Sequence, residues 1–192
     1  MDFQEHKFEV DKSWTLFLDR DGVINIESVG SYITDWEEFK FHDGAMDALK
    51  TAAGLFGNII VVSNQRGVGR GIMTLDALKN INANLRHAIA EYGGRIDKIY
   101  NCTAVNDDDR NRKPNTGMGL QAQEDFPEID FRKSIMVGNS MSDMEFGRRL
   151  LMNTVFITTK YEAVTLPDPL IDEQWDSLGG FIHSLTLQEH EH

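Results

Sequence analysis

The stretch Thr15–Asn25, which reads TLFLDRDGVIN, places two carboxylates directly after a short apolar run. The run Thr15–Leu18 is continuous rather than alternating, which is typical of a strand buried on both faces of a parallel sheet. Asp19 and Asp21 follow where that strand would end, and Gly22 lets the chain turn sharply away. Carboxylates in such a place are costly unless they are paired or bind a metal ion. The stretch therefore predicts an ionic site at the edge of a parallel sheet, with an Asp-rich surface turn as the alternative.

Comparable apolar runs recur along the chain and alternate with helical patterns. Further strands are expected at residues 59–62, 135–137 and 154–157, with a weaker candidate at 96–102. Helices are expected after Asp43, between Thr74 and the pair Gly93-Gly94, from Ser142, and over about 178–185. Ser142 with Glu145 three residues later matches a capping box. The alternation predicts an α/β fold: a three-layer α/β/α sandwich around a mainly parallel, Rossmann-like sheet.

The composition is that of a single globular domain with a strong negative charge. The 192 residues show no internal repeat or linker, so we expect one domain over residues 1–192 with its core at about 14–185. Lys and Arg total 19 against 31 Asp and Glu, a formal charge of −12, which disfavours nucleic acids and anionic membranes as partners. No apolar stretch approaches the ~20 residues of a membrane helix. We therefore expect no nucleic-acid or membrane partner. We also expect a monomer, although neither charge nor composition determines the oligomeric state.

Cys102 is the single cysteine of the chain. One thiol excludes an intrachain disulfide, which fits a reducing compartment, and it cannot build a multi-thiolate zinc site. We expect a cytoplasmic protein.

Polar residues follow the expected strands at the end where such sheets bind ligands. Ser63 can donate a hydrogen bond to a phosphoryl oxygen, and the glycine-rich segment 67–71 can present backbone N–H groups to an anion. Arg66 and Arg70 add guanidinium groups suited to phosphate. The alternative is a glycine-rich turn with solvated arginines. The pattern G-x-x-x-x-G-K-S/T is absent, which disfavours a P-loop nucleotide site.

Two later segments complete the set. Lys113 can hold the charge that builds up on a transferring phosphoryl group, and Arg112 can bind substrate or neutralise an acidic rim. Asn139 and Asp143 offer an amide oxygen and a carboxylate to a divalent cation, which would keep Asp19 ionised and polarise a phosphate for attack. The alternatives are a solvated basic pair and an aspartate that complements a helix dipole.

The order and spacing of these segments resemble the haloacid dehalogenase (HAD) superfamily of phosphohydrolases. The resemblance rests on Asp19-x-Asp21-Gly22, Ser63, Lys113 and Gly138-Asn139-x-x-x-Asp143. Longer segments, 18–25, 32–49, 63–71 and 112–118, look like the branch that contains D-glycero-D-manno-heptose 1,7-bisphosphate phosphatases and histidinol-phosphate phosphatases. Together they cover roughly residues 14–158.

The resemblance implies a HAD sheet without a large cap domain. It also implies a Mg²⁺-dependent phosphomonoesterase acting on a small phosphorylated metabolite, such as heptose bisphosphate or histidinol phosphate. Asp19 would be the nucleophile that forms an aspartyl-phosphate, Asp21 the general acid and base, and Ser63 and Lys113 would steady the phosphoryl group. The expected substrate-binding residues are Asn64, Gln65, Arg66, Arg70 and Arg112. The expected metal-binding residues are Asp19, Asp21, Asn139 and Asp143.

Two features depart from the family pattern. The branch commonly carries a Cys/His zinc loop before its Arg-Lys-Pro motif, but here that interval holds only Cys102 and no His, so we expect no zinc. The usual metal-binding Asp of the fourth motif is Asn139, whose amide oxygen can bind Mg²⁺ but carries no charge. Two alternatives stay open: a polynucleotide 3′-phosphatase, and a degenerate HAD domain that binds a phosphorylated ligand without turnover.

Overall fold

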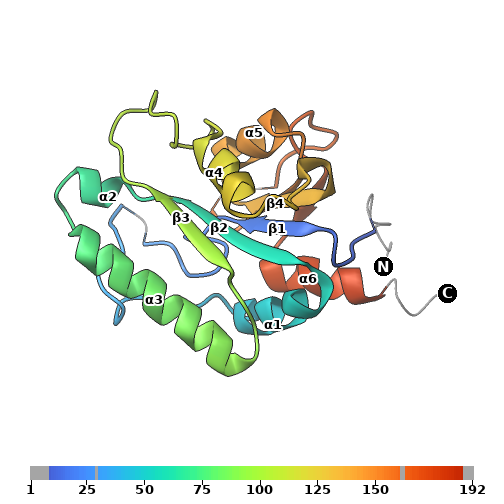
Figure 1. Ribbon diagram of the computed structural model, residues 1–192, viewed down its shortest axis with the longest axis horizontal. Coiled ribbons are helices and arrows are strands. Elements are labelled where there is room, and N and C mark those ends of the chain that lie inside the picture. The colour runs from blue at the N-terminus through green and yellow to red at the C-terminus, as the bar shows by residue number, and fades with distance from the viewer. Residues whose placement is uncertain (1–8, 29, 161–162, 188–192) are drawn as a thin grey trace.

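The computed structural model describes residues 9–28, 30–160 and 163–187, which form a six-stranded sheet between two layers of helices (Figure 1). The strands are β1 (Thr15–Leu18), β2 (Asn58–Asn64), β3 (Lys98–Cys102), β4 (Ser134–Gly138), β5 (Asn153–Ile157) and β6 (Glu173–Trp175). Their order is β3-β2-β1-β4-β5-β6, and every neighbouring pair is parallel. The predicted three-layer α/β/α sandwich is confirmed.

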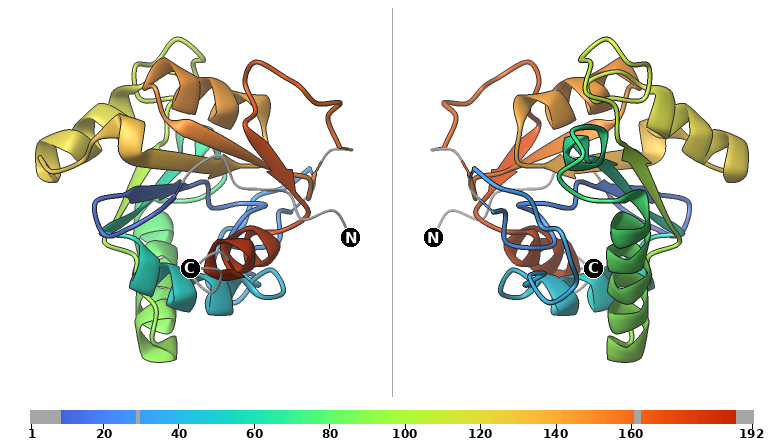
Figure 2. Two further views of the ribbon diagram at one scale, coloured as in Figure 1. Left: turned by 90° about the vertical axis from the view of Figure 1, so that its right-hand side faces the viewer. Right: turned by 90° about the vertical axis from the view of Figure 1, so that its left-hand side faces the viewer.

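The helices divide between the two faces of the sheet (Figure 2). One face is covered by α1 (Ala45–Leu55), α3 (Leu75–Tyr92) and α6 (Leu178–Leu187), and the other by α4 (Gly117–Asp125) and α5 (Met141–Arg149). A single helical turn, α2 (Arg66–Gly69), follows β2, and a 3₁₀ turn, η1 (Phe131–Lys133), precedes β4. Successive side chains of a strand alternate between the two cores: Leu16 and Leu18 pack in one, Phe17 in the other. Both faces of β1 are therefore buried, as its continuous apolar run predicts.

The strand order reverses at β1, which lies between β2 and β4. Leu18 aligns with Val61 of β2 and Val137 of β4, and the backbone N–H of Asp19 donates to the carbonyl of Val137 (3.0 Å). A crevice opens beyond the strand ends at such a switch point. The loop between β1 and α1 lies beside this edge and contains no named helix or strand in its described residues.

Helix ends agree with the sequence prediction in part. The Thr74 hydroxyl accepts a hydrogen bond from the N–H of Ala77, and Gly93 ends α3 with a φ of 95°, as expected. The prediction that Asp43 caps α1 is wrong, because the capping position is Gly44, with a φ of 75° and no side-chain bond. The short edge strand β6 was not predicted because it has no apolar run. Within the described ranges, no helix combines the length and apolar character needed to cross a membrane.

Candidate active site

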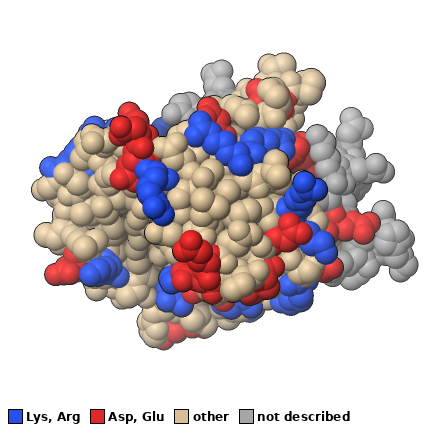
Figure 3. Space-filling view, turned by 45° about the horizontal axis from the view of Figure 1, so that its top comes forward, with Lys and Arg blue, Asp and Glu red and all other residues tan. Residues whose placement is uncertain are grey.

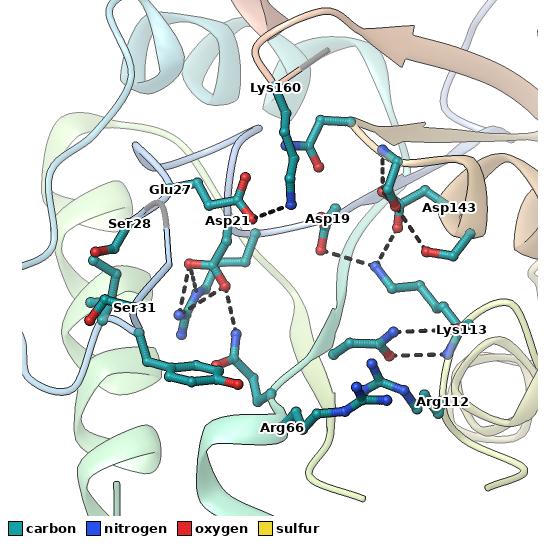
Figure 4. Close-up of a pocket in the computed structure, with 18 of the residues that line it drawn as sticks. Asp19, Asp21, Glu27, Ser28, Ser31, Arg66, Arg112, Lys113, Asp143 and Lys160 are labelled. Atoms are coloured by element: carbon teal, nitrogen blue, oxygen red, sulfur yellow. Dashed lines mark hydrogen bonds and ion pairs between the residues drawn. The ribbon is translucent and has the colours of Figure 1, made fainter. Parts of the chain in front are cut away.

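A buried lysine joins two carboxylates beyond the ends of β1 and β4 (Figure 4). Lys113 Nζ donates to Asp19 Oδ1 (2.9 Å), Asp143 Oδ1 (2.6 Å) and the carbonyl oxygen of Val62 (2.7 Å). These bonds use the three donors of an ammonium group. The three charged groups come from segments separated by up to 124 residues in the chain, from Asp19 to Asp143, and the register of the sheet brings them together.

Asp21 lies in a second network. Its carboxylate accepts from Arg20 (2.9 and 3.1 Å), from Asn25 Nδ2 (2.9 Å) and from Gln65 Nε2 (2.8 Å). Arg20 is almost fully buried, and its guanidinium lies 5.8 Å from the centre of the Phe39 ring. Asp21 is therefore fixed in orientation by a rigid cation and two amides.

The two β2-end residues Ser63 and Asn64 have different positions. Ser63 is fully buried, and its hydroxyl accepts from Gln65 Nε2 (2.8 Å) rather than facing the cavity. Asn64 Nδ2 donates to the carbonyl of Lys113 (3.1 Å), and the N–H of Lys113 donates back to Asn64 Oδ1 (3.0 Å). Asn64 thus holds the backbone of the lysine, while Gln65 covers the serine.

Asp143 is held at the start of α5 by a capping box. Its Oδ2 accepts from the N–H (3.1 Å) and the hydroxyl (2.8 Å) of Ser140, and the Ser140 side chain also bonds to the N–H of Asp143. The predicted capping box at Ser142 and Glu145 is wrong, because α5 begins two residues earlier than that pairing requires. Gly138 is needed beneath it, since a Cβ there would lie 2.2 Å from Asp143 Cβ.

Asn139 packs against Gly22 at the mouth of this cluster. A Cβ on Gly22, which has a φ of 85°, would lie 1.9 Å from Asn139 Nδ2. That Nδ2 is buried and has no hydrogen-bond partner among the described residues. Because amide oxygen and nitrogen are distinguished by their hydrogen bonds, an orphaned nitrogen here indicates that the amide can equally turn its oxygen toward the cavity.

The oxygen atoms around Asp19 suit a small hard cation. Among the described residues, no three His, Cys, Asp or Glu side chains form a metal-binding group. The oxygen donors that line the cavity at this point are instead the Asp19 carboxylate and the Asn139 amide. Mg²⁺ prefers such all-oxygen sets and keeps several waters. These residues therefore fit Mg²⁺, with less negative charge than three carboxylates would supply.

Burial and neighbouring charges shift the pKa values of the site in opposite directions. Burial, with Asp143 and Asp21 nearby, raises the pKa of Asp19 to about 7 despite the opposing effect of Lys113. Burial also acts to raise the pKa of Asp21, but Arg20, Asn25 and Gln65 outweigh it and hold that pKa below the usual value. For Lys113, burial acts to lower the pKa, and Asp143 and Asp19 raise it instead. The lysine is thus charged and Asp21 ionised at neutral pH.

A cavity of about 370 Å³ opens onto these groups. Ten of the eleven predicted site residues line it: Asp19, Asp21, Asn64, Gln65, Arg66, Arg70, Arg112, Lys113, Asn139 and Asp143. The exception is Ser63. On one side lie Arg66 and Arg112, and on the opposite side an ion pair between Lys160 and Glu27 (3.0 Å) (Figure 4).

Several lining residues were missed by the sequence reasoning. Glu27 and Tyr32 belong to the loop between β1 and α1 and do not directly follow a strand, whereas Lys160 lies three residues after the end of β5 but outside any recognised motif. Tyr32 accepts a hydrogen bond from Arg70 NH1 (3.0 Å), and its ring fills the space above Gly67. A Cβ on Gly67 would lie 2.8 Å from that ring, so a glycine is needed where the aromatic side chain packs.

Comparisons with known proteins agree with the motifs. A model of the family described as polynucleotide kinase 3 phosphatase matches residues 15–160. The D-glycero-alpha-D-manno-heptose-1,7-bisphosphate 7-phosphatase of Mycobacterium bovis is 38% identical over 138 residues, 71% of this chain and 73% of its own length. The D-glycero-D-manno-heptose-1,7-bisphosphate 7-phosphatase of Chlorobaculum tepidum is 32% identical over 186 residues, 87% of this chain and 93% of its own length.

A solved structure shares the fold. The D,D-heptose 1,7-bisphosphate phosphatase from B. bronchiseptica, crystallised with magnesium and phosphate, aligns with a TM-score of 0.80 at 24% identity. The alignment covers 92% of this chain and 99% of that one. The resemblance inferred from the motifs is confirmed.

Proposed function

Because the chain belongs to the polynucleotide kinase 3 phosphatase family, a family of HAD-type phosphatases, we propose that it removes one phosphoryl group from a small sugar bisphosphate through a phosphorylated Asp19. The chain is a phosphatase, a hydrolase of phosphate monoesters. The observation that carries the proposal is the contact of Lys113 with both Asp19 and Asp143 at the switch point of the sheet. This contact supports the roles of Asp19 as a carboxylate nucleophile and of Lys113 as a charge-neutralising cation.

Three side chains, those of Asp19, Lys113 and Asp21, share the chemical steps. The Asp19 carboxylate attacks phosphorus, the bond to the leaving oxygen breaks, and Lys113 offsets the charge on the phosphoryl oxygens. In its protonated form, Asp21 gives its proton to the leaving oxygen; the resulting carboxylate then takes a proton from the water that hydrolyses the aspartyl-phosphate, which restores the protonated form. The lowered pKa of Asp21 keeps its carboxylate ionised for the second, proton-accepting step, so the first step starts from the less populated protonated form. Gln65 and Arg20 keep its carboxylate in one orientation for both steps.

We propose that Asp19, the carbonyl of Asp21 and Asn139 hold Mg²⁺. When bound, the cation supplies positive charge that keeps Asp19 ionised and polarises the phosphate. Asp143 has both oxygens engaged by Lys113 and Ser140, so we assign it to holding the lysine rather than the cation. Ser63 acts through Gln65, because its hydroxyl is buried beneath that amide.

The substrate class follows from the relatives and the cavity. Two relatives at 38% and 32% identity are named as phosphatases of heptose 1,7-bisphosphate. The cavity of about 370 Å³ lies in the range of small-molecule sites, and Arg66, Arg70 and Arg112 on its wall suit a second anionic group. Histidinol phosphate, which carries a single phosphate, is the other metabolite to test.

A polynucleotide 3′-phosphatase is the alternative that the family's description raises. The formal charge of −12 opposes a polyanion partner, and on the face drawn in Figure 3 basic and acidic side chains are interspersed. A nucleic-acid groove would favour a continuous basic stripe.

A comparison of substrates tests the proposal. Phosphate release is measured from heptose 1,7-bisphosphate, histidinol phosphate and a 3′-phosphorylated oligonucleotide, with Mg²⁺ and with EDTA. We expect the highest kcat/KM for the bisphosphate, dependence on Mg²⁺, and loss of turnover in Asp19→Asn. Highest activity on the oligonucleotide would establish the alternative. Binding of the bisphosphate without any turnover would identify a degenerate, ligand-binding domain.

A further inference from the structure

Two arginines on the cavity wall share one carboxylate from outside the cavity. Arg112 Nε donates to Asp107 Oδ1 (3.0 Å), and Arg66 Nη2 donates to the same oxygen. Arg66 begins α2, whereas Asp107 and Arg112 belong to the loop between β3 and α4. Both arginines line the cavity, while the Asp107 side chain is 85% exposed.

The Asp107 carboxylate neutralises only part of the charge of the two arginines and pairs with only some of their N–H donors. Two guanidinium groups face a single negative charge, and they meet through only one of the Asp107 oxygens. Arg66 Nε and Arg112 Nη1 are buried, with no hydrogen-bond partner in the part of the chain that the structure describes. Buried donors are normally satisfied. The pair therefore has donors that one carboxylate does not satisfy, which suits an anion with more oxygens and more charge.

We propose that Asp107 is a resident substitute for the second phosphate of the substrate, and that this phosphate displaces it from Arg66 and Arg112. The proposal rests on the proposed function, since it needs a bisphosphate. A phosphate dianion offers three terminal oxygens to two guanidinium forks, a better match in charge and geometry than Asp107. Asp107 is then the residue that sets how strongly the enzyme demands a second phosphate.

The exchange needs only a side-chain rotation. Asn115 Nδ2 donates to the carbonyl oxygens of Asp107 (3.3 Å) and Asp109 (2.8 Å), which holds the loop backbone in place. The Asp107 carboxylate itself is solvated, and ion pairs of exposed carboxylates are weak. The Asp107 side chain can rotate into the solvent, and the two guanidinium groups then stay in place for the incoming phosphate.

The test is Asp107→Asn, assayed with heptose 1,7-bisphosphate and with p-nitrophenyl phosphate, which has one phosphate. Removing the competing charge should lower KM for the bisphosphate about two- to fivefold, the scale of an exposed ion pair. The kcat for the bisphosphate and the KM for p-nitrophenyl phosphate should stay unchanged. Asp108→Asn removes the same charge one residue on and should change neither KM. In an Arg66→Gln background, the effect of Asp107→Asn should shrink.

Other results overturn the proposal in distinguishable ways. A higher KM for the bisphosphate in Asp107→Asn would show that Asp107 orients the arginines instead of competing for them. An unchanged KM, or an equal decrease in Asp108→Asn, would show that Asp107 does not compete at this subsite. In both cases, wild-type preference for the bisphosphate would leave the proposed function standing. A wild-type enzyme without that preference overturns both proposals.

Discussion

Replacing Asp143 by Asn removes one charge from a buried ion pair and leaves the size of the side chain unchanged. Asp143 and Lys113 are 1% and 2% exposed and lie 2.6 Å apart. The carboxylate accepts from Lys113 on one oxygen and from Ser140 on the other. An amide has one accepting oxygen, so Asn can satisfy Lys113 or Ser140 but not both. The substitution therefore leaves a buried donor unpaired beside a buried ammonium group.

The expected loss of stability follows from that burial. Breaking a buried pair by removing one partner costs about 3–5 kcal/mol. Lys113 keeps its bonds to Asp19 and to the carbonyl of Val62, so we expect the lower end, about 3 kcal/mol. For a chain of this size, that corresponds to a decrease in Tm of about 6–12 °C. We also expect kcat to fall by up to about 10²-fold, because Lys113 loses one of the bonds that orient it.

The chain offers a matched control. Lys98 and Asp125 also lie 2.6 Å apart, but their side chains are 45% and 43% exposed. Asp125→Asn changes the same charge at the same distance, and water screens that pair, so we expect a far smaller change in Tm. Both variants and the wild type are unfolded in EDTA, which keeps cation binding out of the comparison. Equal losses for Asp143→Asn and Asp125→Asn would refute the reasoning from burial.

Three further predictions concern the same cavity. Asp21→Asn should lower kcat by about 10²–10⁴-fold while the KM changes little, because the proton transfer is lost and the fold of the site is kept; a kcat within twofold of wild type would contradict its role. Asn139→Asp should tighten Mg²⁺ binding, measured by calorimetry, because a carboxylate attracts a dication more than an amide does; equal affinity would place Asn139 outside the metal site. Without a divalent cation, native Asp19 keeps its proton up to about pH 7, whereas Asp19 of the unfolded chain releases it near pH 3.8. The native state therefore binds more protons in this window, and the free energy of unfolding should fall as pH rises through it. Asp19→Asn should remove that slope in urea titrations made between pH 4 and 8.

Most of the sheet could be predicted because most of its strands are continuous apolar runs in the sequence. Residues 59–62 and 135–137 are apolar because both faces of β2 and β4 are covered, and their polar ends mark the edge that binds ligands. β6 escaped prediction because an edge strand of three residues gains its place from pairing with β5, not from its own composition. The capping box was misplaced because two adjacent serine pairings fit the same pattern, and only the backbone decides between Ser140 and Ser142.

The candidate site could be predicted at the level of residues but not of contacts. The eleven predicted residues include ten on the cavity wall, since motif spacing carries strand ends to one place. The burial of Ser63 beneath Gln65 depends on side-chain rotation, which no local pattern encodes. The contact of Asp107 with Arg66 joins residues 41 apart through a loop without periodicity, so it becomes visible only in three dimensions.

The pair of bonds between Asn64 and the backbone of Lys113 has a consequence for how this chain can vary. The Asn64 amide forms hydrogen bonds with both the N–H and the carbonyl of Lys113. A neighbouring β-strand would bond to the backbone of one residue in the same way. The position of the lysine is therefore set from β2, independently of the path the chain takes from β3. Residues inserted near 105–108 would lengthen the rim while the reacting groups keep their places. Specificity and chemistry can then change separately, since the segment that faces the substrate's far end is anchored apart from the lysine that faces its reacting phosphate.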